Sequence, residues 1–523
     1  MSPAEPRRIL WADDEIELLR PHIRFLEQKG FEVTPVPNGE DALAALSERR
    51  YDVVLLDEMM PGLGGLATLD AIKARDLPVP VILVTKNEEE SLMNEAIGRH
   101  ISDYLIKPVN PSQVFLACKR VLDSPKLQGS QLHRDYVGDM QRWQQLDMRR
   151  LSAAEWIQVA VELARWDVRF DSAPEDGLEQ AHADFKRGLN VEFSHFVEAH
   201  YPSWVRDGEG RPLLSSDVVK HSVAPHLKDG KRVALVVIDC MRLDQWFALE
   251  PLLEEFFNID RNYYCSVLPT ATPYSRNAIF AGLLPAEIWK QHPDMWQEGG
   301  PSERTKNRYE RQLLEFQLKR LGVGTDRSIK YSKIHTAEDA QQVRRQMGSF
   351  GDVQLVSMVF NFIDIVAHGR SESEILQDLA PDEAAFRAVM KAWFTHSPLF
   401  EILRTFAQQN CTVVLTSDHG AVLGRRAALV YGDRETSTNL RYKYGLNLNT
   451  DPKQAVILRK PMDFMLPDDG VNKNYLLARE DFYFVYPTRF HEFERHFRGS
   501  FQHGGISLEE MVLPLLTLTP RRG

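Results

Sequence analysis

Three carboxylates and a lysine follow apolar stretches in the N-terminal part of the chain. Asp13 and Asp14 come after the first stretch, Asp57 comes after another, and Lys107 lies in the segment Asp-Tyr-Leu-Ile-Lys-Pro. Carboxylates that lie together repel one another unless a hard cation separates them, and Mg²⁺ prefers carboxylate and water oxygens. With such a cation bound, one carboxylate can attack a phosphoryl group and carry it as an acyl phosphate. We expect Lys107 and Thr85 to hold the oxygens of that group.

A second set of metal-type ligands recurs through the C-terminal half. The set consists of Asp239, Asp364, His368, Asp418, His419 and His503. Asp364 and His368 are four residues apart, so one helical turn puts both on one side. Imidazole with carboxylate is the ligand mixture of Zn²⁺ sites, with Mn²⁺ and Fe as weaker alternatives. Any one of these residues alone is more often a core histidine or a turn residue, so the prediction depends on the ordered set.

Two metals about 4 Å apart would neutralise a phosphate and activate a hydroxyl as a nucleophile. The segment Leu-Pro-Thr-Ala-Thr-Pro-Tyr-Ser-Arg-Asn offers two hydroxyls for this role, on Thr270 and Thr272. Arg276 and Asn277 are candidate partners of the phosphate or of an oxyanion, although an arginine in a first helical turn is more often solvated.

The elements that must position these residues alternate strand and helix patterns. Residues 8–13, 51–57 and 79–85 are apolar runs of the kind found in parallel sheets, and 16–29 and 40–49 are amphipathic. This rhythm predicts a doubly wound α/β domain with its functional residues at the carboxyl ends of the strands.

The strand pattern disappears between residues 124 and 206. Two helices are expected at 152–168 and 178–199, and the first begins with Ser152 and Glu155 in a capping-box arrangement. Because the segment has more acidic than basic residues, it does not fit a helix-turn-helix that reads DNA. We interpret it as a helical-bundle connector without a DNA-binding domain.

The α/β pattern returns after the connector and continues to the end. Apolar runs at 232–239, 353–359 and 411–418 predict strands, and the first and third end on aspartate. The predicted domains are therefore 1–123, 124–206 and 207–523.

The composition is that of a folded protein of two to four domains. The chain has 523 residues, of which 43% are hydrophobic and 26% charged, which excludes extensive disorder. Its net charge of −11 argues against general coating of nucleic acid, because an acidic protein repels a phosphate backbone. The four cysteines lack the spacing of a disulfide framework or a cysteine zinc cage. No apolar run reaches the roughly 18–20 residues that cross a bilayer, and the N-terminus lacks a signal-peptide core, so we expect a cytoplasmic protein.

The ordered N-terminal set resembles the receiver domain of two-component response regulators over residues 6–123. The set is Asp-Asp, Leu-Leu-Asp-Glu-Met-Met-Pro-Gly, Thr and Lys-Pro. The resemblance implies that Asp57 is the phosphoacceptor. It further implies a magnesium site of Asp13, Asp14, Asp57 and the Met59 carbonyl, and a switch of Thr85, Tyr104 and Lys107.

The C-terminal order of Asp, Thr, Asp-x-x-x-His, Asp-His and His resembles the alkaline phosphatase superfamily. Within it, residues 272–277 and 437–445 look like the PglZ subgroup. The resemblance implies two zinc ions per chain, one held by Asp364, His368 and His503 and the other by Asp239, Asp418, His419 and the threonine. In the superfamily the nucleophile opens a helix, which favours Thr272 over Thr270. A helix N-terminus would add main-chain N–H donors for the phosphoryl oxygens.

The resemblance implies a hydrolase, and two features favour phosphodiesters over monoesters. A third acidic cluster of the kind that holds Mg²⁺ in monoesterases is not recognisable, and a threonine between two zincs is typical of nucleotide phosphodiesterases. Arg441 and Lys443, in a basic and aromatic segment, are candidates to hold a second phosphate beside a stacked base, with an ordinary amphipathic loop as the alternative. We expect a zinc phosphodiesterase acting on nucleotides or short oligonucleotides. The alternative function is a signalling adaptor whose metallodomain binds a partner.

A receiver joined to a PglZ domain is similar to the PorX type of response regulator, which is tied to type 9 secretion. This implies a sensor histidine kinase as phosphate donor and an extracytoplasmic-function sigma factor as a candidate target. Acyl phosphate at Asp57 is expected to reshape the receiver face lined by residues 88–101 and 110–122, which commonly pairs two receivers. We therefore expect a homodimer on phosphorylation.

Overall fold

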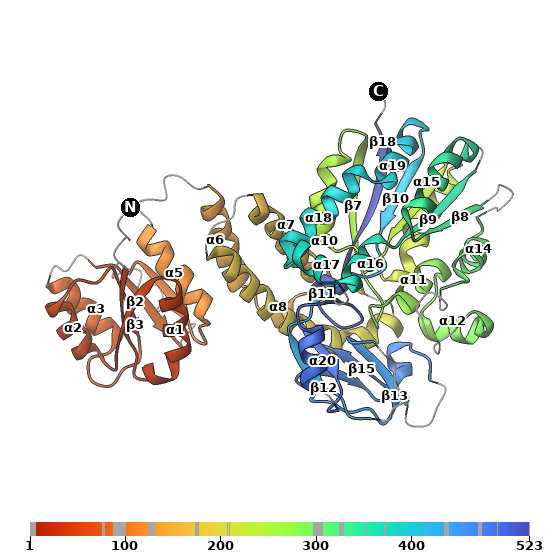
Figure 1. Ribbon diagram of the computed structural model, residues 1–523. Coiled ribbons are helices and arrows are strands. Elements are labelled where there is room, and N and C mark those ends of the chain that lie inside the picture. The colour runs from red at the N-terminus through yellow and green to blue at the C-terminus, as the bar shows by residue number, and fades with distance from the viewer. Residues whose placement is uncertain are drawn as a thin grey trace. The chain divides into compact units, whose positions relative to one another are not determined.

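The computed structural model in Figure 1 divides the chain into two compact units. It describes residues 7–75, 79–86, 101–123, 131–172, 177–206, 208, 210–296, 307–323, 329–351, 353–370, 373–432, 439–468, 473–488 and 490–521. The first unit comprises Met1–Leu146 and Pro174–Lys186, and the second comprises Asp147–Ala173 and Arg187–Gly523. The predicted connector is therefore shared by the two units.

The first unit contains a five-stranded parallel sheet, which agrees with the predicted doubly wound α/β domain. Its strands are β1 (Arg7–Ala12), β2 (Phe31–Val36), β3 (Val53–Asp57), β4 (Val81–Thr85) and β5 (Asp103–Ile106), in the order β2-β1-β3-β4-β5. Its helices are η1 (Ile16–Leu19), α1 (Arg20–Gln28), α2 (Gly39–Glu48), α3 (Gly65–Ala74) and α5 (Pro111–Asp123). Every residue of β3 and β4 is buried, as expected for parallel strands covered on both faces.

The predicted connector is helical, and its helices are longer than the sequence pattern indicated. They are α6 (Gln131–Gln144), η2 (Met148–Arg150), α7 (Ala153–Ser172) and α8 (Leu178–Arg206). The capping box is confirmed, because the Ser152 N–H donates to Glu155 at 2.7 Å and the Glu155 N–H donates to the Ser152 hydroxyl at 3.3 Å.

A six-stranded mixed sheet forms the centre of the second unit. Its strands are β6 (Val233–Ile238), β7 (Phe257–Cys265), β8 (Ile329–Ile334), β9 (Leu355–Phe360), β10 (Thr412–Thr416) and β18 (Val512–Pro520), in the order β7-β18-β10-β6-β9-β8. Strands β8, β9, β6 and β10 are parallel, and β18 runs antiparallel to both of its neighbours. The carboxyl ends of the parallel strands therefore meet at one edge.

Short helices and three small sheets surround this sheet. The helices are η3 (Ser215–Asp217), η4 (Val219–Val223), α9 (Ala224–Lys228), α10 (Leu243–Leu249), η5 (Glu250–Leu252), α11 (Thr272–Ala281), α12 (Pro285–Gln291), η6 (Pro293–Met295), α14 (Glu310–Arg320), α15 (Ala337–Gln346), η7 (Met347–Phe350), α16 (Phe362–Gly369), α17 (Glu374–Leu379), α18 (Glu383–His396), α19 (Pro398–Gln408), η8 (Pro461–Phe464), α20 (Phe490–Phe497) and α21 (Leu508–Met511). The small sheets pair β11 (Val422–Leu423) with β17 (Phe501–Gln502), β12 (Arg426–Leu429) with β16 (Phe482–Val485), and β13 (Tyr442–Leu446) and β14 (Ala455–Leu458) with β15 (Lys473–Ala478).

Ion pairs join α7 to the helices around the sheet of the second unit. Asp244 of α10 accepts from Arg242 at 2.5 Å and from Arg387 of α18 at 2.7 Å. Arg387 also donates to Asp171 of α7 at 2.6 Å. Each buried charge thus has a partner, which a low-dielectric interior requires.

Within the described residues, we find no helix that combines the length and the hydropathy needed to span a membrane.

Candidate functional site

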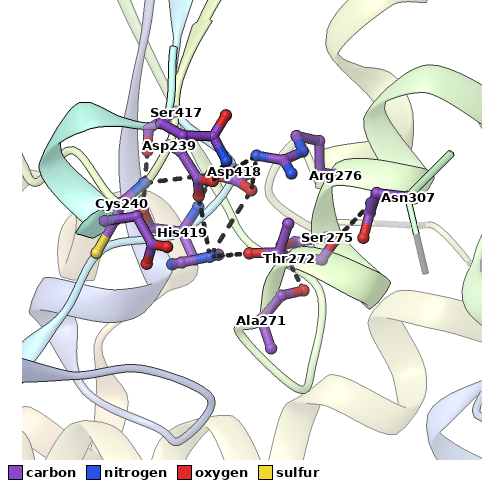
Figure 2. A network of polar contacts seen from close by, with 12 residues as sticks. Asp239, Cys240, Ala271, Thr272, Ser275, Arg276, Asn307, Ser417, Asp418 and His419 are labelled. Atoms are coloured by element: carbon purple, nitrogen blue, oxygen red, sulfur yellow. Dashed lines mark hydrogen bonds and ion pairs between the residues drawn. The ribbon is translucent and has the colours of Figure 1, made fainter. Parts of the chain in front are cut away.

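The predicted ligands of the C-terminal half follow the carboxyl ends of neighbouring parallel strands. Asp239 follows β6, and its N–H donates to the Phe360 carbonyl of β9 at 2.8 Å. Asp418 follows β10, which pairs with β6 in register. Because these strands end at the same edge, the two carboxylates are brought together (Figure 2).

Asp239, Asp418 and His419 form a buried cluster whose ligand atoms lie within 4.8 Å of one another. In each carboxylate, one oxygen is held by the protein. Asp239 Oδ2 accepts from Asn361 Nδ2 at 2.9 Å and from Arg276 Nη1 at 2.6 Å, and Asp418 Oδ1 accepts from the His419 N–H at 3.1 Å. The other two oxygens, Asp239 Oδ1 and Asp418 Oδ2, are buried without a hydrogen-bond partner. Two orphaned carboxylate oxygens beside an imidazole are the arrangement that a divalent cation completes.

The hydroxyl of Thr272 lies directly against this cluster. Thr272 is the first residue of α11, and its Oγ1 is 2.9 Å from His419 Nε2. His419 Nδ1 lies 3.1 Å from the Gly420 carbonyl, which assigns the ring proton to Nδ1 and leaves the Nε2 lone pair directed at the site. Thr270 is used differently: its hydroxyl donates to the Gly505 carbonyl at 2.8 Å. The geometry therefore favours Thr272 as the nucleophile.

The first turn of α11 offers few free main-chain donors. The N–H groups of Tyr274 and Ser275 both donate to the Ala271 carbonyl at 2.9 Å, and Pro273 has no N–H. Among the described residues of this turn, Thr272 alone has a main-chain N–H without a main-chain acceptor, and this N–H could donate to a phosphoryl oxygen. The expected contribution of the helix N-terminus is thus reduced to a single donor.

The second predicted triplet is also brought together. Asp364 and His368 lie one turn apart on α16, and His503 follows β17. His368 Nε2 is 3.0 Å from His503 Nε2 and 3.3 Å from Asp364 Oδ1, which is another buried oxygen without a hydrogen-bond partner. The His503 ring stacks on His419 with centroids 4.0 Å apart, so the two clusters are adjacent.

The electrostatics of the clusters suit metal ligands. Burial lowers the pKa of His419 to about 4 and lowers that of His503 well below its usual value, so both imidazoles are neutral at physiological pH. Burial raises the pKa of Asp418, and the neighbouring Asp239 carboxylate raises it further. For Asp239 the effect of burial is outweighed by the Arg276 guanidinium, which lowers its pKa to about 2.

Arg276 and Asn277 lie at the site, but their polar groups are engaged by the protein. The Arg276 guanidinium is 2% exposed and is held between Asp239 and Glu310, with Nε 2.7 Å from Glu310 Oε1. Asn277 donates to the Pro273 carbonyl at 2.9 Å and accepts from Asn307 at 3.1 Å. Arg276 thus holds a metal-type ligand and Asn277 holds the helix start, and the contact of these two side chains with the phosphate stays a prediction.

Arg441 and Lys443 are core residues rather than surface cations. The Arg441 guanidinium is fully buried and donates to Glu510 at 2.5 Å and to main-chain carbonyls. Lys443 lies on β13, is 2% exposed, and has its ammonium 5.1 Å from the centre of the Tyr486 ring. The sequence predicted a phosphate contact because its basic and aromatic composition does not reveal that Arg441, Tyr442 and Lys443 are all buried. The structure corrects that prediction.

The burial of Lys443 makes stability depend on pH. Burial lowers its pKa to about 7, from about 10.4 in the unfolded chain. The unfolded state therefore binds more protons between about pH 7 and 10, so the free energy of unfolding rises with pH in this window. Below about pH 7 the lysine is charged in both states, and its burial then destabilises the folded state by the full amount. We expect Lys443→Met to raise the free energy of unfolding by up to roughly 4 kcal/mol near pH 6 and by about half as much near pH 9. Urea unfolding at the two pH values measures this, and an equal effect at both would contradict it.

The N-terminal triplet is assembled as predicted at the carboxyl edge of the first sheet. Asp13, Asp14 and Asp57 offer oxygens within 4.8 Å of one another. Lys107 Nζ bridges two of them, at 2.9 Å from Asp13 and 3.0 Å from Asp57. Burial raises the pKa of Asp57, and the lysine opposes that shift. The site thus holds a buried carboxylate beside a fixed cation.

Thr85 and Tyr104, the other predicted switch residues, and Met59, whose carbonyl is a predicted magnesium ligand, differ in burial. Thr85 ends β4 and is buried, and its hydroxyl donates to Glu58. Tyr104 is half-buried on β5 and packs against the core, whereas the Met59 side chain is 68% exposed. The switch face at 110–122 corresponds to α5, whereas residues 88–100 lie outside the described residues.

The sequence analysis missed Asn361, Glu310 and Glu58. Asn361 directly follows β9 and holds Asp239, so the strand-end signal that identified the aspartates could have found it. Glu310 begins α14 and pairs with Arg276, and nothing in its sequence context marks that role.

Comparison with known families agrees with this geometry. A family model described as the BREX system PglZ alkaline phosphatase-like domain matches residues 218–518, which is more than half of the chain. The chain belongs to the PglZ family. Its PglZ domain contains both C-terminal clusters and Thr272. A response regulator receiver domain matches residues 9–119, and a PorX response regulator linker domain matches residues 126–205, so the PglZ domain here is part of a PorX-like fusion.

Individual relatives match the receiver portion that precedes the PglZ domain. The transcriptional regulatory protein ResD of Bacillus subtilis is 32% identical over 122 residues, which are 23% of this chain and 50% of ResD. SrrA of Staphylococcus aureus is 32% identical over 22% of this chain and 47% of its own. The match thus spans about half the length of these relatives. Among solved structures, a receiver domain protein of Clostridium thermocellum is 29% identical over 23% of this chain and 98% of its own, with a TM-score of 0.22.

Proposed function

We propose that this response regulator has a zinc-dependent phosphodiesterase as its output domain, with nucleotides or short oligonucleotides as substrates. The observation that carries the proposal is the Thr272 hydroxyl, 2.9 Å from His419 Nε2 and beside two adjacent clusters of metal-type ligands. Family membership supports a hydrolase of the alkaline phosphatase superfamily. Among the described residues, the groups of metal-type ligands are the two clusters of the PglZ domain and the receiver triplet.

Each residue of the centre has a definable part in this reaction. Bound zinc would neutralise the phosphate and lower the pKa of the Thr272 hydroxyl. Thr272 Oγ1 would form the bond to phosphorus while the bond from phosphorus to the leaving alkoxide breaks, and the hydroxyl proton would pass through solvent to that alkoxide. Water would next cleave the phosphothreonine bond, which releases the phosphomonoester and restores the hydroxyl. Asn361 and Arg276 fix Asp239, and Thr270 fixes the turn at Gly504 and Gly505 that follows His503.

The proposal is tested by metal content and diester hydrolysis on the same preparation of the full chain. Mass spectrometry of the metals should find about two zinc ions per chain, and bis(p-nitrophenyl) phosphate should be hydrolysed. Dialysis against a chelator should remove both the zinc and the activity, and zinc should restore them. Bound zinc without turnover on this or on dinucleotide substrates would contradict the proposal.

An adaptor function is the second candidate. Ile375 and Leu379 lie one turn apart on α17 and are 72% and 56% exposed, which favours a surface that a protein partner covers. An extracytoplasmic-function sigma factor or a component of type 9 secretion would be such a partner. If the metallodomain acts as a scaffold, partner binding and the cellular output should survive loss of the Thr272 hydroxyl.

Phosphorylation is proposed to gate the output through α5 and α8. In the first unit, the Ser112 hydroxyl of α5 donates to Asp184 of α8 at 2.6 Å. In the second unit, Asn190 of the same helix accepts from the Leu508 N–H at 2.7 Å, and Tyr201 accepts from the Leu268 N–H at 2.9 Å. Leu268 lies four residues before Thr272, and Leu508 lies five residues after His503. Helix α8 therefore contacts the segment that carries Thr272 and the segment that carries His503.

We predict that a sensor kinase phosphorylates Asp57 and that the modified receivers pair. Light scattering should show monomers without the phosphate mimic beryllofluoride and dimers with it, because charge at Asp57 reorients Thr85 and the α5 face. Asp57→Ala should stay monomeric in both conditions. An unchanged mass of the wild type with beryllofluoride bound would contradict the gating model.

A further inference from the structure

A guanidinium group lies inside one of the two metal clusters. Arg276 Nη1 is 2.6 Å from Asp239 Oδ2 and 3.6 Å from Asp418 Oδ2 (Figure 2). Asp418 Oδ2 is one of the two buried oxygens left without a hydrogen-bond partner. A cation bound by this cluster would therefore share a ligand oxygen with a fixed positive charge.

Glu310 also holds the Arg276 guanidinium in place. Its Nε donates to Glu310 Oε1 at 2.7 Å, and Glu310 is fully buried. The second oxygen of Glu310 accepts from the Tyr331 hydroxyl and lies 3.5 Å from Lys333 Nζ. Because Arg276 is 2% exposed and tied at both ends, it has no solvated position to which it could withdraw.

In the neighbouring cluster, the carboxylate is paired with imidazoles. Within the part of the chain that the structure describes, the ion pairs of Asp364 are with His368 and His503 alone. Its two imidazoles and one carboxylate form a ligand set that zinc favours. Repulsion between a divalent ion and a unit charge a few ångströms away amounts to several kcal/mol in a partly shielded site.

We propose that Arg276 is a positioning residue that makes Asp239, Asp418 and His419 the weaker of two metal sites, filled after Asp364, His368 and His503. The inference rests on the proposed function only in taking both clusters as metal sites. The guanidinium aligns Asp239 and neutralises part of the charge of the carboxylates, so this cluster holds together without a metal. The same charge then lowers the affinity of the cluster for its metal.

Titration of the metal-free full chain with Co²⁺ tests the order, with the visible absorption of bound Co²⁺ and the heat of binding as readouts. The wild type should show two steps that differ in affinity by about tenfold or more. His368→Ala should retain only the weak step, and His419→Ala should retain only the tight one. Together these variants assign each step to its cluster.

Two variants separate the charge effect from loss of structure. Arg276→Met with Glu310→Gln removes both buried charges, a change that folded proteins commonly tolerate, and should tighten the second step by about tenfold or more. Glu310→Gln alone leaves the guanidinium without its outer partner and should weaken that step. If the substitutions damaged the fold, the second step would weaken in the double variant as well as in Glu310→Gln. Arg276→Lys keeps a positive charge at this position and should preserve the order in which the two sites fill.

The outcomes distinguish this inference from the proposed function. Two steps of equal affinity in the wild type, or a second step that the double variant leaves unchanged, would overturn the role of Arg276 while the two-metal centre stands. A chain that binds no Co²⁺ at all would overturn the proposed function itself.

Discussion

Thr272→Val should reduce diester hydrolysis by roughly 10³-fold or more while leaving both metal ions bound. Valine has nearly the shape of threonine but lacks the hydroxyl that lies 2.9 Å from His419 Nε2. The side chain is 4% exposed at the start of α11, so the substitution keeps the packing. It removes the attacking oxygen, and Asp239, Asp418 and His419 remain to hold the metal. Steady-state hydrolysis of bis(p-nitrophenyl) phosphate, with metal content measured on the same sample, gives the result.

Thr270→Val is the matched control for that experiment. The Thr270 hydroxyl donates to the Gly505 carbonyl and accepts from the Gly504 N–H, so among the described residues its hydrogen bonds are to the turn after His503 and not to the metal-type ligands. Its loss should cost about 1–3 kcal/mol of stability, with a much smaller fall in turnover than at Thr272. If Thr272→Val binds zinc and turns over like the wild type, the nucleophile has been misassigned.

Strand-end reasoning identified most of the ligands from the sequence. Asp239 and Asp418 each end an apolar run, and parallel strands bring their carboxyl ends to one edge, so the sequence alone predicts that these carboxylates meet. The four-residue spacing of Asp364 and His368 works in the same way, because a helix places such residues on one side. In both cases the signal lies in local geometry that one segment determines by itself.

The roles of the buried cations could not be predicted in this way. Arg276 was expected at the phosphate because it lies one turn after Thr272, yet its partners Asp239 and Glu310 come from distant segments. Pairing of that kind depends on tertiary packing, which neither spacing nor composition reveals. The basic and aromatic composition around Lys443 likewise does not reveal that Arg441, Tyr442 and Lys443 are all buried inside the fold.

Arg441→Met should lower the free energy of unfolding by about 3–5 kcal/mol, because it leaves a buried carboxylate without its cation. Arg441 and Glu510 are both fully buried and pair at 2.5 Å. Glu510 also accepts from the Gly505 N–H at 2.8 Å, so the pair supports the turn that follows His503. Denaturant unfolding of the wild type and the variant measures the loss.

The companion variant Arg441→Met with Glu510→Gln distinguishes a structural pair from a substrate contact. With both charges removed, no buried charge is stranded, and much of the stability should return. A residue that binds a substrate phosphate would behave in the opposite manner: Arg441→Met would raise KM, leave stability unchanged, and gain nothing from the second substitution. That result would restore Arg441 to the substrate site. The expected result instead makes its buried pair with Glu510 a support for the loop of His503, so that the position of a metal-type ligand depends on an ion pair that no substrate touches.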